Sequence, residues 1–180
     1  MIYIETERLV LQTPGAADLP AYLAYRNEPT ALAAQRMGAI EKEEARAFLQ
    51  AQEELLEAAT GWRMLGIREK EKLDDGIVGE VGVFLHPGQP EGDMGWWLHP
   101  RKRGLGIATE AARALLDWCF ADRRLHRVTS GCLVDNAESF RLMTRLGMRL
   151  ETRSIESRRL GEDWYDEIGC ALLRREWAKA

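Results

Sequence analysis

Cysteine and histidine are scarce in this sequence of 180 residues. The three cysteines, Cys119, Cys132 and Cys170, show no CxxC spacing, and an odd number cannot form a complete set of disulfides. We therefore expect reduced thiols rather than a disulfide framework. The three histidines lie far apart and form no HExxH pair, so the sequence predicts no metal site.

Long apolar runs and an excess of positive charge are also missing. No stretch approaches the ~18 uninterrupted apolar residues of a membrane helix, and the N-terminal residues contain no apolar signal core. We therefore expect a cytoplasmic protein that does not bind membranes. The net charge of −4 argues against direct nucleic-acid binding, because phosphate contacts need a strong positive excess. A composition of 46% hydrophobic and 30% charged residues fits one folded domain over residues 1–180.

Hydrophobic periodicity and turn residues predict a mixed α/β chain. Apolar residues at i, i+3 and i+4 spacing between Ala45 and Ala59 indicate an amphipathic helix. Asp18 and Asn136 are expected to cap the N-termini of two helices, and Gly147 to end the second of these. The strands do not alternate regularly with the helices, which favours a mixed sheet with helices on both faces. The predicted strands cover 8–12, 62–69, 76–85, 94–99, 126–134, 148–159 and 164–173, and the predicted helices cover 18–27, 41–59, 107–120 and 135–146.

A basic, glycine-containing turn between a buried strand and a helix could bind an anion. Residues 101–103 are Arg-Lys-Arg, and Gly104 and Gly106 follow. Backbone N–H groups at such a turn point toward one place at the positive end of the helix dipole, which suits a pyrophosphate. No GxxxxGK[ST] string is present, and Thr109 stands where GxGxxG needs its last glycine. Taken alone, the turn fits a tight strand-to-helix connection equally well.

A second segment carries a family resemblance. Together, the two segments resemble the GNAT superfamily of acyl-CoA N-acetyltransferases. Arg103-x-x-Gly106-x-Ala108 is similar to the R/Q-x-x-G-x-G/A pyrophosphate loop of that family, and Arg101-x-x-Gly104-x-Gly106 fits the same pattern two residues earlier. Asn136-x-x-Ser139 and Leu146-Gly147-Met148 are similar to its N-x-x-S…L-G-F helix, with Met148 in place of Phe.

The two ends of the chain resemble one branch of this family. The opening Thr6-Glu7-Arg8-Leu9-Val10-Leu11 is similar to the T-E-R-L-x-L of RimJ/RimL-like enzymes. Asp166, Leu172-Leu173 and Glu176-Trp177 resemble the closing D-H-x-x-Y-x-L-L…E-W of the same branch. Glu167 replaces the His of that pattern and Cys170 replaces the Tyr. The resemblance spans nearly the whole chain.

The resemblance implies a fold and an acyl donor. The GNAT fold has a central mixed, mostly antiparallel twisted sheet, here of about seven strands, with acetyl-CoA between two central strands, 94–99 and 126–133. Backbone at 97–99 would hold the pantetheine and thioester, and an N–H near Leu98 would polarise the thioester carbonyl. Residues 103–109 would take the pyrophosphate. The cofactor-binding residues implied in this way are Trp97, Leu98, His99, Arg101, Arg103, Gly104, Leu105, Gly106, Ile107, Ala108, Thr109, Asn136 and Arg145.

Catalysis would need a base, because only a neutral amine attacks a thioester. An α-amine, with a pKa of about 7.8, needs only a mild one. Asp93 is the preferred base, in the register where the family often has a glutamate, and Glu80 is the second candidate; either could instead be a solvent-facing carboxylate. Many GNAT enzymes have an acidic tyrosine seven residues after the motif Asn, but Met143 stands there and cannot donate. Ser139 remains as the candidate acid, or as a helix-start or cofactor contact.

The implied function is acetyl-CoA-dependent N-acetylation, with the N-terminal α-amine of a protein, of ribosomal type, as the expected acceptor. One alternative is a small amine such as an aminoglycoside, a polyamine or an amino acid. Another is a CoA-binding sensor without turnover. A homodimer or higher homo-oligomer stays open. The acids that would suit a small cationic acceptor are Glu91, Asp93, Glu162, Asp163 and Asp166.

Overall fold

The computed structural model describes residues 2–36, 38–56 and 59–177, and its strands form one eight-stranded sheet in the order β1-β2-β3-β4-β5-β6-β8-β7. All neighbouring strands are antiparallel except β5 and β6, which are parallel. The sheet is thus mixed and mostly antiparallel, as predicted, with one strand more than expected, β1. The strands are β1 (Tyr3–Glu5), β2 (Leu9–Gln12), β3 (Gly61–Glu69), β4 (Gly79–Leu85), β5 (Glu91–Leu98), β6 (Arg127–Leu133), β7 (Arg149–Leu160) and β8 (Asp163–Leu173).

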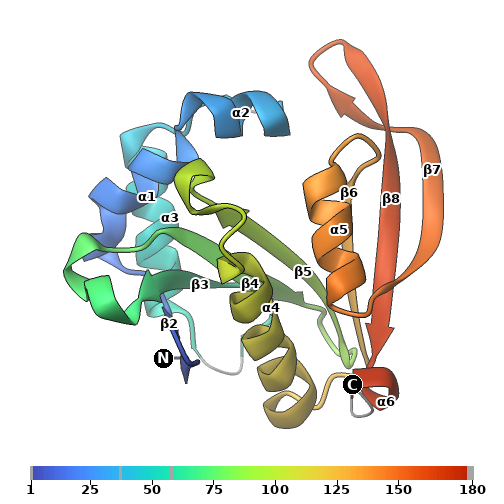
Figure 1. Ribbon diagram of the computed structural model, residues 1–180, viewed down its shortest axis with the longest axis horizontal. Coiled ribbons are helices and arrows are strands. Elements are labelled where there is room, and N and C mark those ends of the chain that lie inside the picture. Colours follow the sequence, from blue (N-terminus) through green and yellow to red (C-terminus); the bar gives the residue numbers. More distant parts are fainter. Residues whose placement is uncertain (1, 37, 57–58, 178–180) are drawn as a thin grey trace.

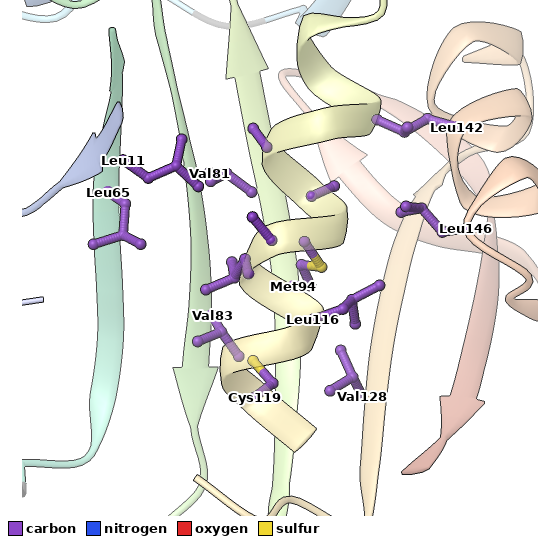
Figure 2. Close-up of a cluster of buried hydrophobic side chains, with 14 of the residues drawn as sticks. Leu11, Leu65, Val81, Val83, Met94, Leu116, Cys119, Val128, Leu142 and Leu146 are labelled. Carbon is purple, nitrogen blue, oxygen red and sulfur yellow. The ribbon is translucent and has the colours of Figure 1, made fainter. Parts of the chain in front are cut away.

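Helices cover both faces of the sheet, as the sequence predicts (Figure 1). The larger core lies under α4 and α5, where Leu116 and Cys119 of α4 and its continuation meet Met94 and Val128 of the sheet (Figure 2). A smaller core lies under α1 and α3 and includes Trp97 of β5. The helices are α1 (Leu19–Arg26), α2 (Pro29–Gln35), α3 (Lys42–Glu54), α4 (Ile107–Asp117), α5 (Ala137–Arg145) and α6 (Arg174–Trp177).

The two faces of β5 belong to different cores. Its register with β4 is continuous from Gly92 to Leu98, so its side chains alternate without interruption. Met94, Trp96 and Leu98 pack in the core under α4, whereas Trp97 packs in the core under α1 and α3. Odd-numbered side chains of β5 therefore face α1 and α3, and even-numbered side chains face α4.

Two helices differ from the prediction for identifiable reasons. Helix α1 ends at Arg26, before Pro29, as predicted, but Pro29 then begins a helix that was not predicted, α2, where a proline at the first position leaves no helical hydrogen bond unmade. The Glu28 carboxylate accepts from the Ala31 N–H and caps this helix. Helix α3 ends at Glu54 rather than near residue 59, because the buried Arg63 side chain donates to the carbonyl oxygens of the segment that follows. Residues 57–58 of the predicted helix lie outside the described part.

Several local predictions are confirmed. The Asn136 side chain accepts from the Ser139 N–H at 3.0 Å and caps α5, and Gly147 follows α5 with a φ of 80°. Asp18 stands at the N-cap of α1, but its carboxylate accepts from the Gly15 N–H, at 3.0 Å, and pairs with Arg68 instead of capping the helix. No helix in the described ranges is long and apolar enough to cross a membrane.

Candidate active site

The two parallel strands at the centre of the sheet separate after three residue pairs. Glu91, Gly92 and Asp93 of β5 pair with residues 127–129 of β6, and the pairing of the two strands ends there. Beyond Asp93, β5 continues to Leu98 paired with β4 on its other edge. The two strands therefore form a V whose vertex is the Asp93–Thr129 pair.

Backbone N–H groups of β5 point into this V. The His99 N–H donates to Val78 next to β4 at 2.9 Å, and the Pro90 carbonyl accepts from the His126 N–H next to β6. Backbone groups of successive residues in a strand point to opposite edges. The N–H groups of Met94, Trp96 and Leu98 therefore face the open side of the V, and that of Met94 is nearest the vertex.

The predicted anion turn lies at the wide end of the V. Gly104 and Gly106 have φ angles of 75° and 80°, a left-handed conformation that favours glycine. Gly106 is the N-cap residue of α4, and the Glu110 N–H makes the first helical bond to its carbonyl. The preceding N–H groups of the first turn have no partner within the helix, so they can bind an anion at the positive end of the dipole.

A cleft of about 260 Å³ connects this turn, the free edge of β5 and the first turns of α5. Its lining carries four cations and one carboxylate, Glu138, although the whole chain has a net charge of −4. Lys102 is paired with Glu69, and Arg103 lies 3.3 Å from Glu138. The cleft is therefore locally positive and suits a phosphate-bearing ligand. Its lining residues are Trp96, Trp97, Leu98, Lys102, Arg103, Gly104, Gly106, Ile107, Ala108, Thr109, Asn136, Glu138, Ser139, Arg141, Leu142 and Arg145.

Most residues selected from the sequence as cofactor contacts lie in this lining, and three do not. Leu105 is 56% exposed, and its carbonyl oxygen accepts from Arg8 Nη1 at 3.1 Å. His99 Nδ1 accepts from the Arg101 N–H at 3.1 Å, so these two residues form a local turn beside the cleft. Trp97 lines the cleft, but its indole lies on the opposite face of the sheet, where Nε1 donates to the Tyr25 carbonyl.

Some residues that line the cleft were not predicted from the sequence. Trp96 and Lys102 flank selected positions, whereas Glu138, Arg141 and Leu142 belong to α5. The α5 residues and Arg145 recur at i, i+3, i+4 and i+7 from residue 138, which is one face of a helix. Extending the Asn136–Ser139 motif along the helix with this periodicity would have predicted the α5 residues of the lining.

Ser139 and Met143 lie on α5 in different surroundings. Ser139 lines the cleft, and its backbone N–H is the donor that Asn136 accepts. Met143 is fully buried in the core under α4 and α5. Ser139 is thus one of the α5 residues that line the cleft, whereas Met143 packs in the core.

The two candidate bases lie on the face of the sheet opposite α4, since Asp93 is odd-numbered on β5 and Glu80 pairs with Trp97. The Asp93 side chain is 49% exposed. It accepts from the Thr129 hydroxyl across the vertex, and its other oxygen lies 2.9 Å from His86 Nε2. The Asp93 carboxylate is therefore fixed at the vertex of the V but accessible from the side of α1 and α3.

Glu80 is buried, with only 3% of its surface exposed. Its carboxylate lies 3.1 Å from Arg26 Nη1, and the Arg26 guanidinium stacks over the Trp97 ring. Burial raises the pKa of the Glu80 carboxyl, although Arg26 opposes that shift. The position of Glu80 suits it to hold α1 against the sheet rather than to meet a substrate.

Thr6 and Arg8, in the opening motif of the chain, hydrogen-bond to the anion turn and to the first turn of α4. The Glu110 carboxylate, in the first turn of α4, accepts from the Thr6 hydroxyl at 2.6 Å and from the Arg8 N–H at 2.9 Å. Arg8 also pairs with Glu110 through its guanidinium, at 2.6 Å, and donates to the Leu105 carbonyl. Thr6 and Arg8 therefore join β2 to both the turn and the helix that form the anion site.

A split parallel strand pair beside an anion-binding helix start defines an acyltransferase-like architecture, and comparisons with known proteins give the family. The model of the acetyltransferase (GNAT) domain matches residues 8–149, so the chain belongs to the GNAT acetyltransferases and is an N-acetyltransferase.

Individual relatives agree with this family. The uncharacterized N-acetyltransferase YnaD of Bacillus subtilis is 27% identical over 98% of this chain and 99% of its own length. A GNAT-family acetyltransferase from Bacillus anthracis is 26% identical, with a TM-score of 0.85 over 97% of this chain and all of its own. RimL, a ribosomal L7/L12 α-N-protein acetyltransferase solved with coenzyme A, shares the fold at 21% identity, with a TM-score of 0.83 over 96% and 98% of the two chains.

Proposed function

We propose that this enzyme transfers the acetyl group of acetyl-CoA directly to a primary amine, the N-terminal α-amine of a protein. One observation carries the proposal: the V between β5 and β6 has a cationic cleft at its wide end and an accessible carboxylate at its vertex. RimL, which has the same fold, is a protein α-N-acetyltransferase and was solved with coenzyme A.

The acyl donor would occupy the cleft along β5. Its pyrophosphate would bind the N–H groups at the start of α4 with Arg103 and Arg145 nearby, and its pantetheine would bond to the β5 backbone as an added strand. Leu98, the residue expected from the sequence to polarise the thioester, lies ~17 Å along the strand from Asp93, at ~3.4 Å per residue. The Met94 N–H is nearest to the vertex, and we therefore assign it the role of polarising the thioester carbonyl.

Asp93 would act as the base. Its carboxylate is held by Thr129 and His86 on the accessible side of the vertex, where it can accept the proton of an incoming ammonium. An α-amine, with a pKa of about 7.8, is partly neutral near pH 7, so a weak base is sufficient. The neutral amine then attacks the thioester carbon, and the collapse of the tetrahedral intermediate breaks the C–S bond. Glu80, 3% exposed and paired with Arg26, suits this task less well.

Ser139 is the candidate to protonate the leaving thiolate. Its residue lines the cleft on the α5 side of the V. A serine hydroxyl is a weak acid, and it would stabilise the thiolate mainly by donating a hydrogen bond.

The register of the sheet favours a protein N-terminus over a polycationic small molecule. Of the acids that would suit a polycation, only Glu91 and Asp93 lie near the vertex; those of the β7–β8 hairpin do not, because β8 is antiparallel to β6 and Thr129 pairs with Ala171. At ~3.4 Å per residue, Asp166 and Asp163 therefore lie roughly 17 and 27 Å along β8 from that point. Asp166 is also bonded to the Glu156 N–H and to Arg153.

The test is release of free thiol from acetyl-CoA with a panel of N-terminal peptides, spermidine and an aminoglycoside, with products identified by mass spectrometry. We expect amine-dependent thiol release with peptides, a loss of about a hundredfold or more in kcat for Asp93→Asn, and a smaller loss for Ser139→Ala. The variant Asp166→Asn is the matched control and should remain active. Turnover of the small amines alone would overturn the acceptor assignment, and CoA binding without any turnover would support the sensor alternative.

A further inference from the structure

An aromatic row crosses the face of the sheet that carries Asp93. The rings of Trp62 on β3 and Phe84 on β4 meet edge to face with centroids 5.8 Å apart, and Phe84 meets His86 at 5.2 Å in the same manner. Phe84 is paired with Asp93 in the sheet register, and His86 contacts the Asp93 carboxylate. The row therefore runs from the edge of α3 to the vertex of the V.

Gly95 allows the Trp62 ring to reach β5, whereas a Cβ atom on its paired Gly82 would meet the Met64 side chain. Gly82 and Gly95 are paired with each other and lie on the same face of the sheet as Asp93. A Cβ atom placed on Gly95 would lie 3.4 Å from the Trp62 six-membered ring, so this ring lies over Gly95, two residues along the strand from Asp93. That separation corresponds to ~7 Å. A Cβ atom alone would make an ordinary contact with the ring, but a side chain longer than that of alanine at position 95 would displace it.

The aromatic row is exposed to solvent although its side chains are large and apolar. Trp62 is 43% exposed, and the Asp93 side chain is 49% exposed. The nearby cation Arg127 is engaged by Glu151 of β7, and Glu91 lies on the same face as Asp93 and adds negative charge. An ammonium would therefore meet a carboxylate and an aromatic ring together, which is the combination that attracts amines attached to apolar groups.

From this juxtaposition we infer that Trp62, lying over Gly95, is the specificity-determining residue of an acceptor subsite that binds the apolar group next to the reacting amine. The acceptor amine approaches Asp93 from the side of α1 and α3, while the acyl donor occupies the V from the side of α4. The ligand class is a primary amine on an apolar or aromatic carbon skeleton, either a peptide N-terminus with an apolar first side chain or a free arylalkylamine. The inference rests on the proposed function.

The test compares two matched pairs of acceptors: peptides beginning with Leu or Gly, and phenethylamine or ethylamine. For each pair the readout is the ratio of kcat/KM values, apolar over small. We expect Trp62→Ala to lower this ratio about five- to tenfold and Trp62→Phe to preserve most of it. The control Leu73→Ala removes an apolar side chain of similar exposure, 48%, at the opposite end of the β3–β4 pair, and should change nothing. The affinity for CoA should be the same in all variants.

The outcomes separate the inference from the function on which it rests. If the wild type acetylates amines and Trp62→Ala leaves both ratios unchanged, the inference is wrong and the function stands. If no amine is acetylated, the proposed function is wrong, and the subsite is then judged by binding alone. For that purpose the indole N–H resonance of Trp62, assigned through its loss in Trp62→Phe, is followed by NMR as phenethylamine is added. A saturable shift supports the subsite, and the absence of a shift overturns it.

Discussion

Replacing Glu110 by glutamine tests whether the opening motif of the chain stabilises the anion turn. The Glu110 side chain is only 19% exposed and accepts from the Thr6 hydroxyl, the Arg8 N–H and the Arg8 guanidinium. Glutamine keeps the shape but has one acceptor oxygen, and its amide N–H groups face the Arg8 donors.

The expected loss of stability is about 2 kcal/mol. The Thr6 hydroxyl and the Arg8 N–H both donate to Oε1, which glutamine keeps, but each hydrogen bond to a neutral amide is worth about 1 kcal/mol less than one to a carboxylate. The ion pair itself adds little, since Arg8 is 52% exposed and pairs of that kind are worth ~0–1 kcal/mol. For a chain of this size, 2 kcal/mol corresponds to a fall in Tm of about 4–8 °C.

Thermal and urea unfolding followed by circular dichroism at pH 7 would measure this loss. The matched control is Glu43→Gln, a 75% exposed carboxylate in the first turn of α3 that also pairs with an arginine. Its loss should stay within about 0.5 kcal/mol. A double-mutant cycle with Arg8→Met isolates the coupling between the two side chains. A Tm within 1 °C of wild type for Glu110→Gln, or no coupling in the cycle, would refute the reasoning.

The sign of the pH dependence gives a second check on Glu110. Its hydrogen bonds to Thr6 and Arg8 outweigh desolvation and lower its pKa below the ordinary 4.5. A carboxyl with a lowered pKa contributes stability that is present above its unfolded pKa and is lost as the pH falls through its folded pKa. The difference in stability between wild type and Glu110→Gln should therefore shrink below about pH 4.5.

Three further predictions test other parts of the molecule. Gly106→Val should weaken CoA binding more than tenfold, as measured by calorimetry, because the φ of Gly106 is 80° and a Cβ atom there would lie 3.3 Å from Arg8 Nη2. The control Gly88→Val, at a glycine with a φ of 69° and open space around it, should leave CoA binding unchanged. Leu116→Ala, at a fully buried position of α4, should cost roughly 2–5 kcal/mol in urea unfolding, and a loss below 1 kcal/mol would contradict the packing described. Arg127 and Arg149 lower the pKa of Glu151 to about 2. Glu151→Gln should therefore destabilise the protein at pH 7, and this loss of stability should disappear as the pH falls from 4.5 toward 2. Equal losses of stability at pH 7 and pH 2 would contradict this assignment.

Much of the candidate site could be predicted from the sequence because its signals are local. The glycines of the anion turn, the Asn136 cap and the end of α5 at Gly147 depend on a few neighbouring residues and on conformations that these residue types favour. The core-facing side of α4 follows from helical periodicity in the same way. Prediction was weaker where a side chain of another element intervenes, as when Arg63 of β3 donates to carbonyl groups beyond the end of α3.

What the sequence by itself determined is most of the helices and strands, the anion turn and the family that these motifs resemble. Only the tertiary structure decided how residues far apart along the chain meet. Sheet register brings Thr129 to Asp93 and thereby sets the vertex of the V, and packing brings Glu110 to Thr6 across 104 positions. The same register assigns Asp93 and Trp62 to the face away from the cationic cleft. Such contacts depend on which strands pair and in what register, and a shift of one residue would move every side chain to the other face.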